Sequence, residues 1–231
     1  NYALIGPGVS QNPNQPISLR EPHGFQLGGV SMPHGKTNPP HMHFTCEVFM
    51  CFRGDWRIMW GFNPEEKHTV ITEGDIVSVP TWIYRAFRNV GVDDGFLFSG
   101  LGRDDTGGIL WGPWTIEQAR QAGVYLTEDY RMIDTRRGDA LPKDVRLLQP
   151  MSDAEIAALE DWDAERMRER VVRFADGAVV SDVGQLLEHS RVSASLNKQG
   201  MPSAMARMQG NTSDCRRRLG GHGRESCVHV A

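Results

Sequence analysis

The sequence predicts an all-β fold, a small antiparallel barrel or sandwich, followed by a helical segment. Three observations favour this class. Residues 24–101 contain short apolar or alternating runs, turn signals separate these runs, and glycine and proline are abundant, with 25 and 13 copies in 231 residues. Alternation with frequent turns is typical of half-buried antiparallel strands. A hydrophobic content of 39% is enough to build a buried core.

Charge and hydropathy argue against two classes of partner. The chain has 25 Lys and Arg against 29 Asp and Glu, and this net charge of −4 argues against binding to nucleic acid. The longest apolar run, residues 48–52, is far shorter than the roughly 20 residues that span a membrane. The four cysteines show no C-x-x-C spacing, and the N-terminal residues do not resemble a signal peptide. A cytoplasmic protein with reduced thiols is therefore expected.

The β-rich part follows an N-terminal arm. Residues 1–23 are rich in Pro, Asn and Gly and show no periodicity, so we expect an irregular arm there. Strands are then expected at residues 25–32, 47–53, 56–60, 69–72, 75–79, 84–89 and 96–100. Evenly spaced short strands of this kind form a sandwich or a small barrel.

Residues 111–177 are expected to form a helical linker. Thr115 to Gln118 match a capping box and Gly123 offers a stop, which predicts a helix at about 116–122. A second capping box, from Ser152 to Glu155, predicts a longer helix that reaches residue 171 or so. Its acidic first half and basic end match the helix dipole.

One stretch combines three side chains of metal-binding type. His41 and His43 lie two residues apart in an extended segment, so both imidazoles emerge on one face. Glu47 has the same parity, which lets its carboxylate converge on that face. Two imidazoles and one carboxylate suit a divalent first-row metal and leave coordination positions open. The sequence therefore predicts a metal centre, with iron(II) expected first and manganese, nickel or zinc as alternatives.

These residues resemble the first motif of the cupin family, G-x5-H-x-H-x3,4-E-x6-G, which is matched by Gly35, His41, His43, Glu47 and Gly54. Residues 74–89 resemble the second motif, G-x5-P-x-G-x2-H-x3-N. Its Gly, Pro and Asn are present, whereas Trp82 replaces the second glycine and Arg85 replaces the histidine. The resemblance covers residues 24–101. It implies a small antiparallel jelly-roll barrel over residues 24–110, with the metal ligands at its mouth.

The replacement of the histidine affects the predicted metal centre. In cupins this histidine usually supplies a fourth protein ligand, which Arg85 cannot do because a guanidinium has no lone pair to give. Three ligands can suffice, since two-His-one-carboxylate sites hold non-haem iron. His34 and His68 are candidate substitutes. The opposing interpretation is that the metal has been lost and the pocket only binds a ligand.

Residues 178–231 resemble the start of a second, truncated cupin repeat. The sequence from Gly210 to Ser213 echoes that from Gly35 to Asn38, and residues 225–230 echo residues 47–52. His222 and Glu225 are candidate degenerate ligands. The favoured interpretation is a repeat kept for structure, without a working site.

The resemblance implies a metal-dependent enzyme that acts on a small acidic or phenolic molecule, most specifically a ring-cleaving dioxygenase of the gentisate or quercetin type. Arg85 is expected to hold a substrate carboxylate or phenolate, and Tyr84 and Arg85 are the expected catalytic residues. Phe49, Trp60 and Trp82 are expected to line the substrate pocket.

Two other functions stay open. One is a non-catalytic cupin that binds a small acidic ligand without metal. The other is a cupin isomerase or lyase, with Tyr84 or Glu47 as acid or base. A homodimer is expected by analogy with other cupin barrels, and no nucleic-acid or membrane partner is expected.

Overall fold

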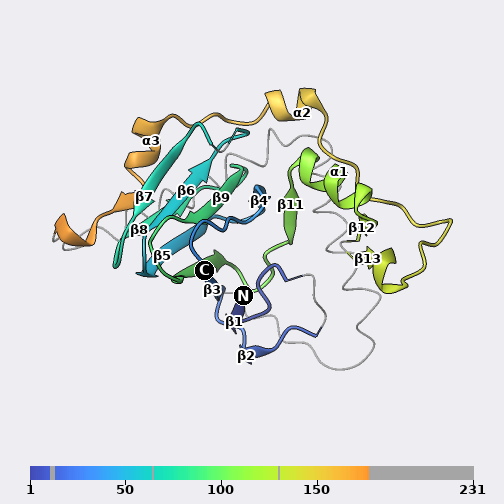
Figure 1. The fold of residues 1–231 in the computed structure, drawn as a ribbon, viewed down its shortest axis with the longest axis horizontal. Coiled ribbons are helices and arrows are strands. Elements are labelled where there is room, and N and C mark those ends of the chain that lie inside the picture. The colour runs from blue at the N-terminus through green and yellow to red at the C-terminus, as the bar shows by residue number, and fades with distance from the viewer. Residues whose placement is uncertain (11–13, 64, 130, 177–231) are drawn as a thin grey trace, which may run out of the picture.

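Two β-sheets enclose the core of the protein, and a two-stranded hairpin lies beside them (Figure 1). The computed structural model describes residues 1–10, 14–63, 65–129 and 131–176. Most strand pairs are antiparallel, and β1 and β2 form a parallel pair. The predicted all-β class is therefore confirmed. The second repeat expected at residues 178–231, with its candidate ligands, lies outside the described residues.

The larger sheet has seven strands. In spatial order they are β14 (Val171–Val172), β8 (Ile76–Val79), β5 (Glu47–Arg53), β10 (Gly95–Gly102), β3 (Phe25–Met32), β1 (Tyr2–Ile5) and β2 (Ile17–Leu19). The five-stranded sheet contains β11 (Ile109–Trp111), β4 (His41–His43), β9 (Arg85–Asn89), β6 (Trp56–Trp60) and β7 (His68–Ile71). The hairpin pairs β12 (Val124–Leu126) with β13 (Met132–Asp134).

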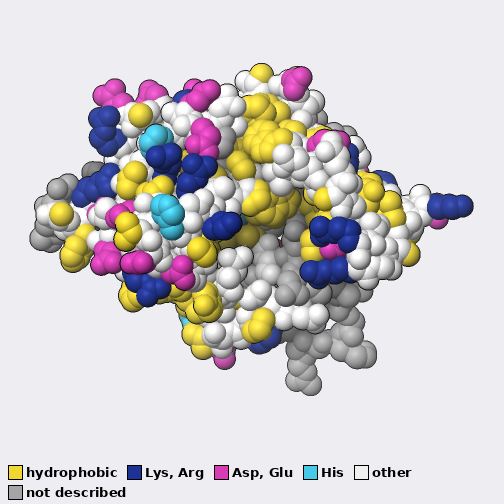
Figure 2. Space-filling view, in the orientation of Figure 1, with side chains coloured by type: hydrophobic (Ala, Val, Ile, Leu, Met, Phe, Trp, Pro, Cys, Tyr) yellow, Lys and Arg dark blue, Asp and Glu magenta, His cyan; other side chains and the backbone are white. Residues whose placement is uncertain are grey.

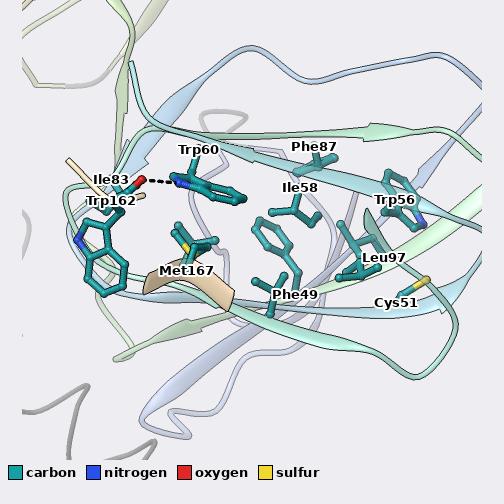
Figure 3. Close-up of a cluster of buried hydrophobic side chains, with 13 residues drawn as sticks. Phe49, Cys51, Trp56, Ile58, Trp60, Ile83, Phe87, Leu97, Trp162 and Met167 are labelled. Carbon is teal, nitrogen blue, oxygen red and sulfur yellow. Dashed lines mark hydrogen bonds between the residues drawn. The ribbon is translucent and has the colours of Figure 1, made fainter. Parts of the chain in front are cut away.

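The main hydrophobic core lies between the two sheets (Figure 3). Alternate residues of β5 supply it, since Phe49 and Cys51 are buried whereas Val48 and Met50 on the opposite face are exposed. This alternation is the pattern of a strand with one buried face. The strands expected at residues 25–32, 47–53 and 56–60 coincide with β3, β5 and β6. The other four expected strands agree with β7 to β10 within two residues, whereas β4 and β11 have no predicted counterpart.

The described residues after the barrel contain the helices α1 (Pro113–Gln121), α2 (Asp153–Ala157) and α3 (Ala164–Arg168). They also contain 3₁₀ turns at Thr135–Arg137 and Phe174–Asp176. The helix α1 begins earlier than its expected capping box, because a proline with its fixed φ occupies the first turn after Gly112. None of the helices in the described ranges has the length and hydropathy to cross a bilayer.

The single long helix expected from Ser152 to about residue 171 is wrong. The capping box at Ser152 is present, but α2 ends at Ala157, and a turn and irregular residues separate it from Asp163, which caps α3. The interruption brings the Trp162 carbonyl within 2.9 Å of Trp60 Nε1, which donates a hydrogen bond to it (Figure 3). Met167 is also fully buried in the main core. Tertiary packing therefore overrides the helical pattern, and the expected linker covers the barrel.

The N-terminal arm contains regular structure that its sequence does not signal. Strand β1 pairs with β3, and β2 pairs in turn with β1. Figure 2 shows the exterior, where acidic and basic side chains are interspersed over the barrel. Through β1 and β2 the N-terminal arm extends the larger sheet, and residues of the arm form one wall of a cavity.

Candidate metal centre

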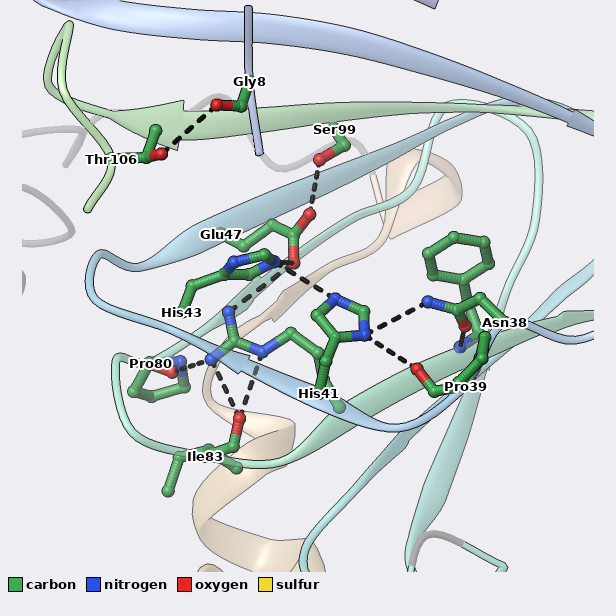
Figure 4. Close-up of polar contacts among 12 residues, drawn as sticks. Gly8, Asn38, Pro39, His41, His43, Glu47, Pro80, Ile83, Ser99 and Thr106 are labelled. Atoms are coloured by element: carbon green, nitrogen blue, oxygen red, sulfur yellow. Dashed lines mark hydrogen bonds and ion pairs between the residues drawn. The ribbon is translucent and has the colours of Figure 1, made fainter. Parts of the chain in front are cut away.

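Two strands that are consecutive in the chain but belong to different sheets position the three predicted ligands (Figure 4). His41 and His43 are the first and last residues of β4, and Glu47 is the first residue of β5. The chain passes from one sheet to the other between these strands, so the three side chains meet where the sheets approach. All three are buried, with exposed fractions of 5% or less. Their ligand atoms lie within 4.8 Å of one another.

The donor set fits a divalent metal ion. His41 Nε2 lies 3.1 Å from His43 Nε2, and His43 Nε2 lies 3.2 Å from Glu47 Oε2. Two donors that are each about 2.1 Å from one metal ion and at right angles lie about 3 Å apart. Glu47 Oε2 is buried and accepts no hydrogen bond. Its ion pair with Arg85 Nη1 is 3.5 Å long, so a direct bond to a metal ion is the kind of contact that this oxygen lacks.

The ionisation states also suit metal binding. Burial is the main cause that lowers the pKa of His41 to about 3, and the neighbouring His43 lowers it further. Burial alone would raise the pKa of Glu47, but the nearby His43 and Arg85 outweigh burial and lower this pKa to about 2. At neutral pH His41 is therefore uncharged and Glu47 is ionised. These are the forms that give a lone pair to a metal.

Neighbouring groups hold the ligands in orientation. His41 Nδ1 lies 2.9 Å from the Pro39 carbonyl, which can only accept, so Nδ1 carries the proton and Nε2 keeps its lone pair. Ser99 Oγ donates a hydrogen bond to Glu47 Oε1 (Figure 4). Such outer partners fix the direction of metal ligands and tune their affinity.

Arg85 lies directly behind Glu47. Its guanidinium is fully buried, and Nη1 is 3.5 Å from Glu47 Oε2. The Ile83 carbonyl accepts hydrogen bonds from Nε at 3.1 Å and from Nη2 at 2.9 Å. The Pro80 carbonyl accepts a further one from Nη2. The side chain points inward, and its Nε and Nη2 donors are held by backbone carbonyls.

A cavity of about 510 Å³ is lined by the three ligands. This volume lies in the range of small-molecule sites. Apolar side chains supply much of the wall: Leu27, Val30, Met32, Phe87, Leu101, Ile109 and Trp111. Among the described residues no Lys or Arg lines the cavity, and Glu47 is the only Asp or Glu that does so. The expected contact between Arg85 and a substrate carboxylate is therefore not provided here, because Arg85 does not line the cavity.

The aromatic side chains expected around the substrate lie in the core instead. Phe49 and Trp60 belong to the cluster between the sheets (Figure 3). Trp82 packs edge-to-face on Phe44, with ring centroids 5.0 Å apart. None of the three expected side chains lines the cavity. Both inner faces of a two-sheet barrel are apolar, so an inward side chain reaches the cavity only near the mouth.

Tyr84 also lies outside the cavity lining. It is 1% exposed in a second apolar cluster, and its hydroxyl donates to Met151 Sδ at 3.5 Å. Burial raises the pKa of Tyr84 above its usual range. It does not line the cavity, so the structure gives it no contact with a ligand bound there.

The candidate substitutes for the fourth ligand do not join the centre. His34 Nδ1 contacts the Gly91 carbonyl, and His34 lines a separate depression at the loops around Gly54. His68 is exposed on β7. In the part of the chain that the structure describes, the only group of potential metal ligands is the triad.

The N-terminal arm contributes residues that sequence reasoning missed. Residues 1–3 and 7–10 and Gln15 line the same cavity as the triad. Gly8 N donates to Gln26 Oε1, and Thr106 Oγ donates to the Gly8 carbonyl at 3.3 Å (Figure 4). The arm carries no periodic pattern, so nothing in its sequence signals this role. Ser99 was detectable, because it has the parity of the inward residues of β10.

Several solved structures are similar to part of this chain at low sequence identity. An oxalate oxidase structure is 22% identical, with a TM-score of 0.36, and the match covers 40% of this chain and 48% of that one. An RmlC-like cupin family protein from Methanocaldococcus jannaschii is 19% identical with a TM-score of 0.32, over 35% and 71% of the two chains. Salicylate 1,2-dioxygenase from Pseudoaminobacter salicylatoxidans is 16% identical with a TM-score of 0.30, over 34% and 20%.

The chain matches about half of the length of the oxalate oxidase structure. No curated protein has a significantly similar sequence. Residues 26–111 match the cupin family model. This range contains the triad and every strand from β4 to β11. The match and the two facing antiparallel sheets together identify residues 26–111 as a cupin domain.

Proposed function

We propose that this chain is a metal-dependent cupin enzyme that acts on a small acidic or phenolic organic molecule. The supporting observation is the buried group of His41, His43 and Glu47 in the wall of a mostly apolar cavity of about 510 Å³. Two imidazoles and one carboxylate leave coordination positions open on a first-row metal. A divalent metal held there supplies a Lewis acid, and iron(II) also supplies reactivity toward dioxygen.

Within this class we propose a ring-cleaving dioxygenase with iron(II) as its first candidate metal. Phe87 and Trp111 line the cavity close to the ligands, and the Trp111 ring centroid lies 5.6 Å from that of His41. Flat aromatic walls suit a planar ring and exclude water from it. His41, His43 and Glu47 would hold the metal, and Ser99 would keep the Glu47 carboxylate in place.

Metal content is the first test of this function. The purified wild-type protein, reconstituted with iron(II), manganese(II), nickel(II) or zinc(II), is expected to hold one ion per chain. His43→Ala removes one donor and should lose this ion, while the circular dichroism spectrum of the barrel is retained. His34→Ala is the matched control, because His34 lies outside the triad. A wild-type protein without stoichiometric metal under all four conditions would refute the proposal.

Oxygen uptake then tests the reaction class. Iron-loaded protein is expected to consume oxygen with at least one member of a panel of gentisate, catechols and flavonols. If the loaded protein consumes none with any of them, ring cleavage fails and a proton-transfer reaction becomes the better proposal. In that case Glu47 is the candidate base, because Tyr84 does not line the cavity.

One observation favours a second candidate, a cupin that binds its ligand without metal. Arg85 Nη1 lies 3.5 Å from Glu47 Oε2, so a permanent cation already partners the only carboxylate of the triad. Such a pair makes the metal-free form less unfavourable than an isolated buried carboxylate. The metal measurement separates the two candidates, since only the enzyme needs a stoichiometric ion.

A further inference from the structure

The position of Arg85 sets the charge of the candidate metal centre. The side chain is fully buried, and Nη1 lies 3.5 Å from Glu47 Oε2. Hydrogen bonds to the carbonyls of Ile83 and Pro80 fix the other end of the guanidinium. The cation can neither reach the cavity nor swing into solvent without breaking these bonds. It is therefore a permanent part of the wall behind Glu47.

The two charges cancel before any ligand binds. A guanidinium stays protonated in proteins, and the carboxylate of Glu47 is its single anionic partner in the triad. No other acidic side chain among the described residues lines the cavity. A divalent ion on the triad would therefore keep both of its positive charges in a largely apolar enclosure. An uncompensated charge of that size is costly there, so the bound ligand must supply the balancing charge.

From this charge balance, and resting on the metal-dependent function proposed above, we propose that the centre selects dianionic ligands that bring two negatively charged oxygens to the metal, and that Arg85 sets this preference. Three protein ligands leave room for two ligand oxygens on a metal of higher coordination number. Arg85 is a positioning residue in this scheme, because it acts through Glu47 and touches neither substrate nor cavity.

The test compares two probes of nearly equal shape and different charge. Oxalate is a dianion and oxamate is the matching monoanion, and both chelate through two neighbouring groups. Titration calorimetry on manganese(II)-loaded protein gives the ratio of their affinities, and metal content is checked afterwards because oxalate also binds free metal. The affinity for manganese(II) itself is measured separately by electron paramagnetic resonance.

Opposite changes are expected when the cation is removed. Arg85→Gln should bind manganese(II) at least tenfold more tightly, because Glu47 is no longer neutralised. Its preference for oxalate over oxamate should fall at least tenfold. Arg85→Lys keeps the charge and should stay within about threefold of the wild type in both measurements. Arg88→Gln is the control on the same strand, because Arg88 pairs with Glu65 instead.

Three results would overturn the proposal. One is that Arg85→Gln binds manganese(II) more weakly while its ratio of oxalate to oxamate affinity is unchanged. This result would mean that Arg85 only holds the Glu47 side chain in position. If Arg85→Gln does not fold, the test uses the wild type, whose ratio of oxalate to oxamate affinity must exceed the same ratio for free manganese(II) in water at least tenfold. Equality of these two ratios is the second result, and it refutes the preference. The third is a wild-type protein that binds no divalent metal, which refutes the proposed function and this inference together.

Discussion

The carboxylate of Glu47 faces three different partners, and its chemistry depends on all of them. His43 Nε2 lies 3.2 Å from Oε2, Arg85 approaches the same oxygen, and Ser99 donates to Oε1. Burial by itself raises the pKa of this carboxyl, but His43 and, to a smaller extent, Arg85 outweigh burial and lower the pKa to about 2. A single buried residue is therefore held in its charged form by neighbours from three other positions in the chain.

These shifts predict how the stability of the metal-free protein depends on pH. The pKa of His41 is lowered from 6.5 to about 3 in the folded state, chiefly by burial. Between these two pH values the unfolded chain binds a proton that the folded chain does not, so the free energy of unfolding falls as the pH drops below 6.5. One such proton contributes about 1.4 kcal/mol per pH unit. Glu47, lowered from 4.5 to about 2, adds to the same loss below pH 4.5.

Urea denaturation of the metal-free protein between pH 7 and pH 5 measures this dependence. His41→Gln removes the titrating imidazole, so its free energy of unfolding should fall less steeply with acid than that of the wild type. His68→Gln is the control, because His68 is exposed on β7 and lies outside the triad. Equal pH slopes for wild type and His41→Gln would contradict the depressed pKa of His41.

The sequence reveals the triad because parity along an extended segment decides the face of each side chain. Arg85 has the same parity as Phe87 and Asn89, and all three are buried, but the sequence alone did not say which face of this strand is inward. Parity gives the face of the strand from which a side chain projects, but it does not give the position that the end of a long side chain reaches inside the barrel. The position of the guanidinium behind Glu47 depends on the packing of two sheets, which residue spacing does not encode.

At the scale of elements, the turn between β8 and β9 shows what the departure at residue 82 means. The second cupin motif has a glycine at this place, and Trp82 occupies it with φ at +64°. Left-handed backbone is costly for a residue with a Cβ, and glycine avoids that cost. The indole offsets the strain, since it is 8% exposed and packs on Phe44.

This conformation predicts an unusual order of stability. Trp82→Ala and Trp82→Gly both lose the indole, but only alanine keeps a Cβ in the left-handed region. We therefore expect Trp82→Gly to be more stable than Trp82→Ala by about 1 kcal/mol in chemical denaturation. Phe52, 61% exposed on β5, is the control position. There the ordinary order should hold, with alanine more stable than glycine by about 0.5–1 kcal/mol. The ordinary order at residue 82 would contradict the strain.

Strands were more predictable than helices because their signal is local. The edges of β5 and β6 follow from alternation and from turns such as the one at Gly54, where φ is +87°. The break between α2 and α3 has no glycine or proline to announce it. It arises because Trp162 and Met167 reach the core, and that contact joins segments about a hundred residues apart.

At the scale of the whole molecule, the segment after the barrel is part of the barrel's own core. Trp162 and Met167 belong to the cluster between the sheets, and β14 adds a strand beside β8 (Figure 1). Arg173 extends the attachment through a 2.8 Å ion pair with the buried Asp75. The N-terminal arm, at the other end of the chain, is also attached to the barrel and lines its cavity. Neither attachment could be predicted from sequence, because each depends on which face of the finished barrel is left uncovered.

If this segment belongs to the core, a substitution in it must destabilise the barrel. Met167 is fully buried, so Met167→Ala should lower the free energy of unfolding by about 2–5 kcal/mol in urea denaturation. Met132→Ala is the matched control, because Met132 is 47% exposed on β13 and should change stability by less than about 0.5 kcal/mol. Hydrogen exchange gives the sharper readout: amides of β6 and β8 should lose protection in Met167→Ala together with those of α3. Loss confined to α3 would mean that the segment unfolds apart from the sheets and that its contacts with Trp60 stabilise only itself.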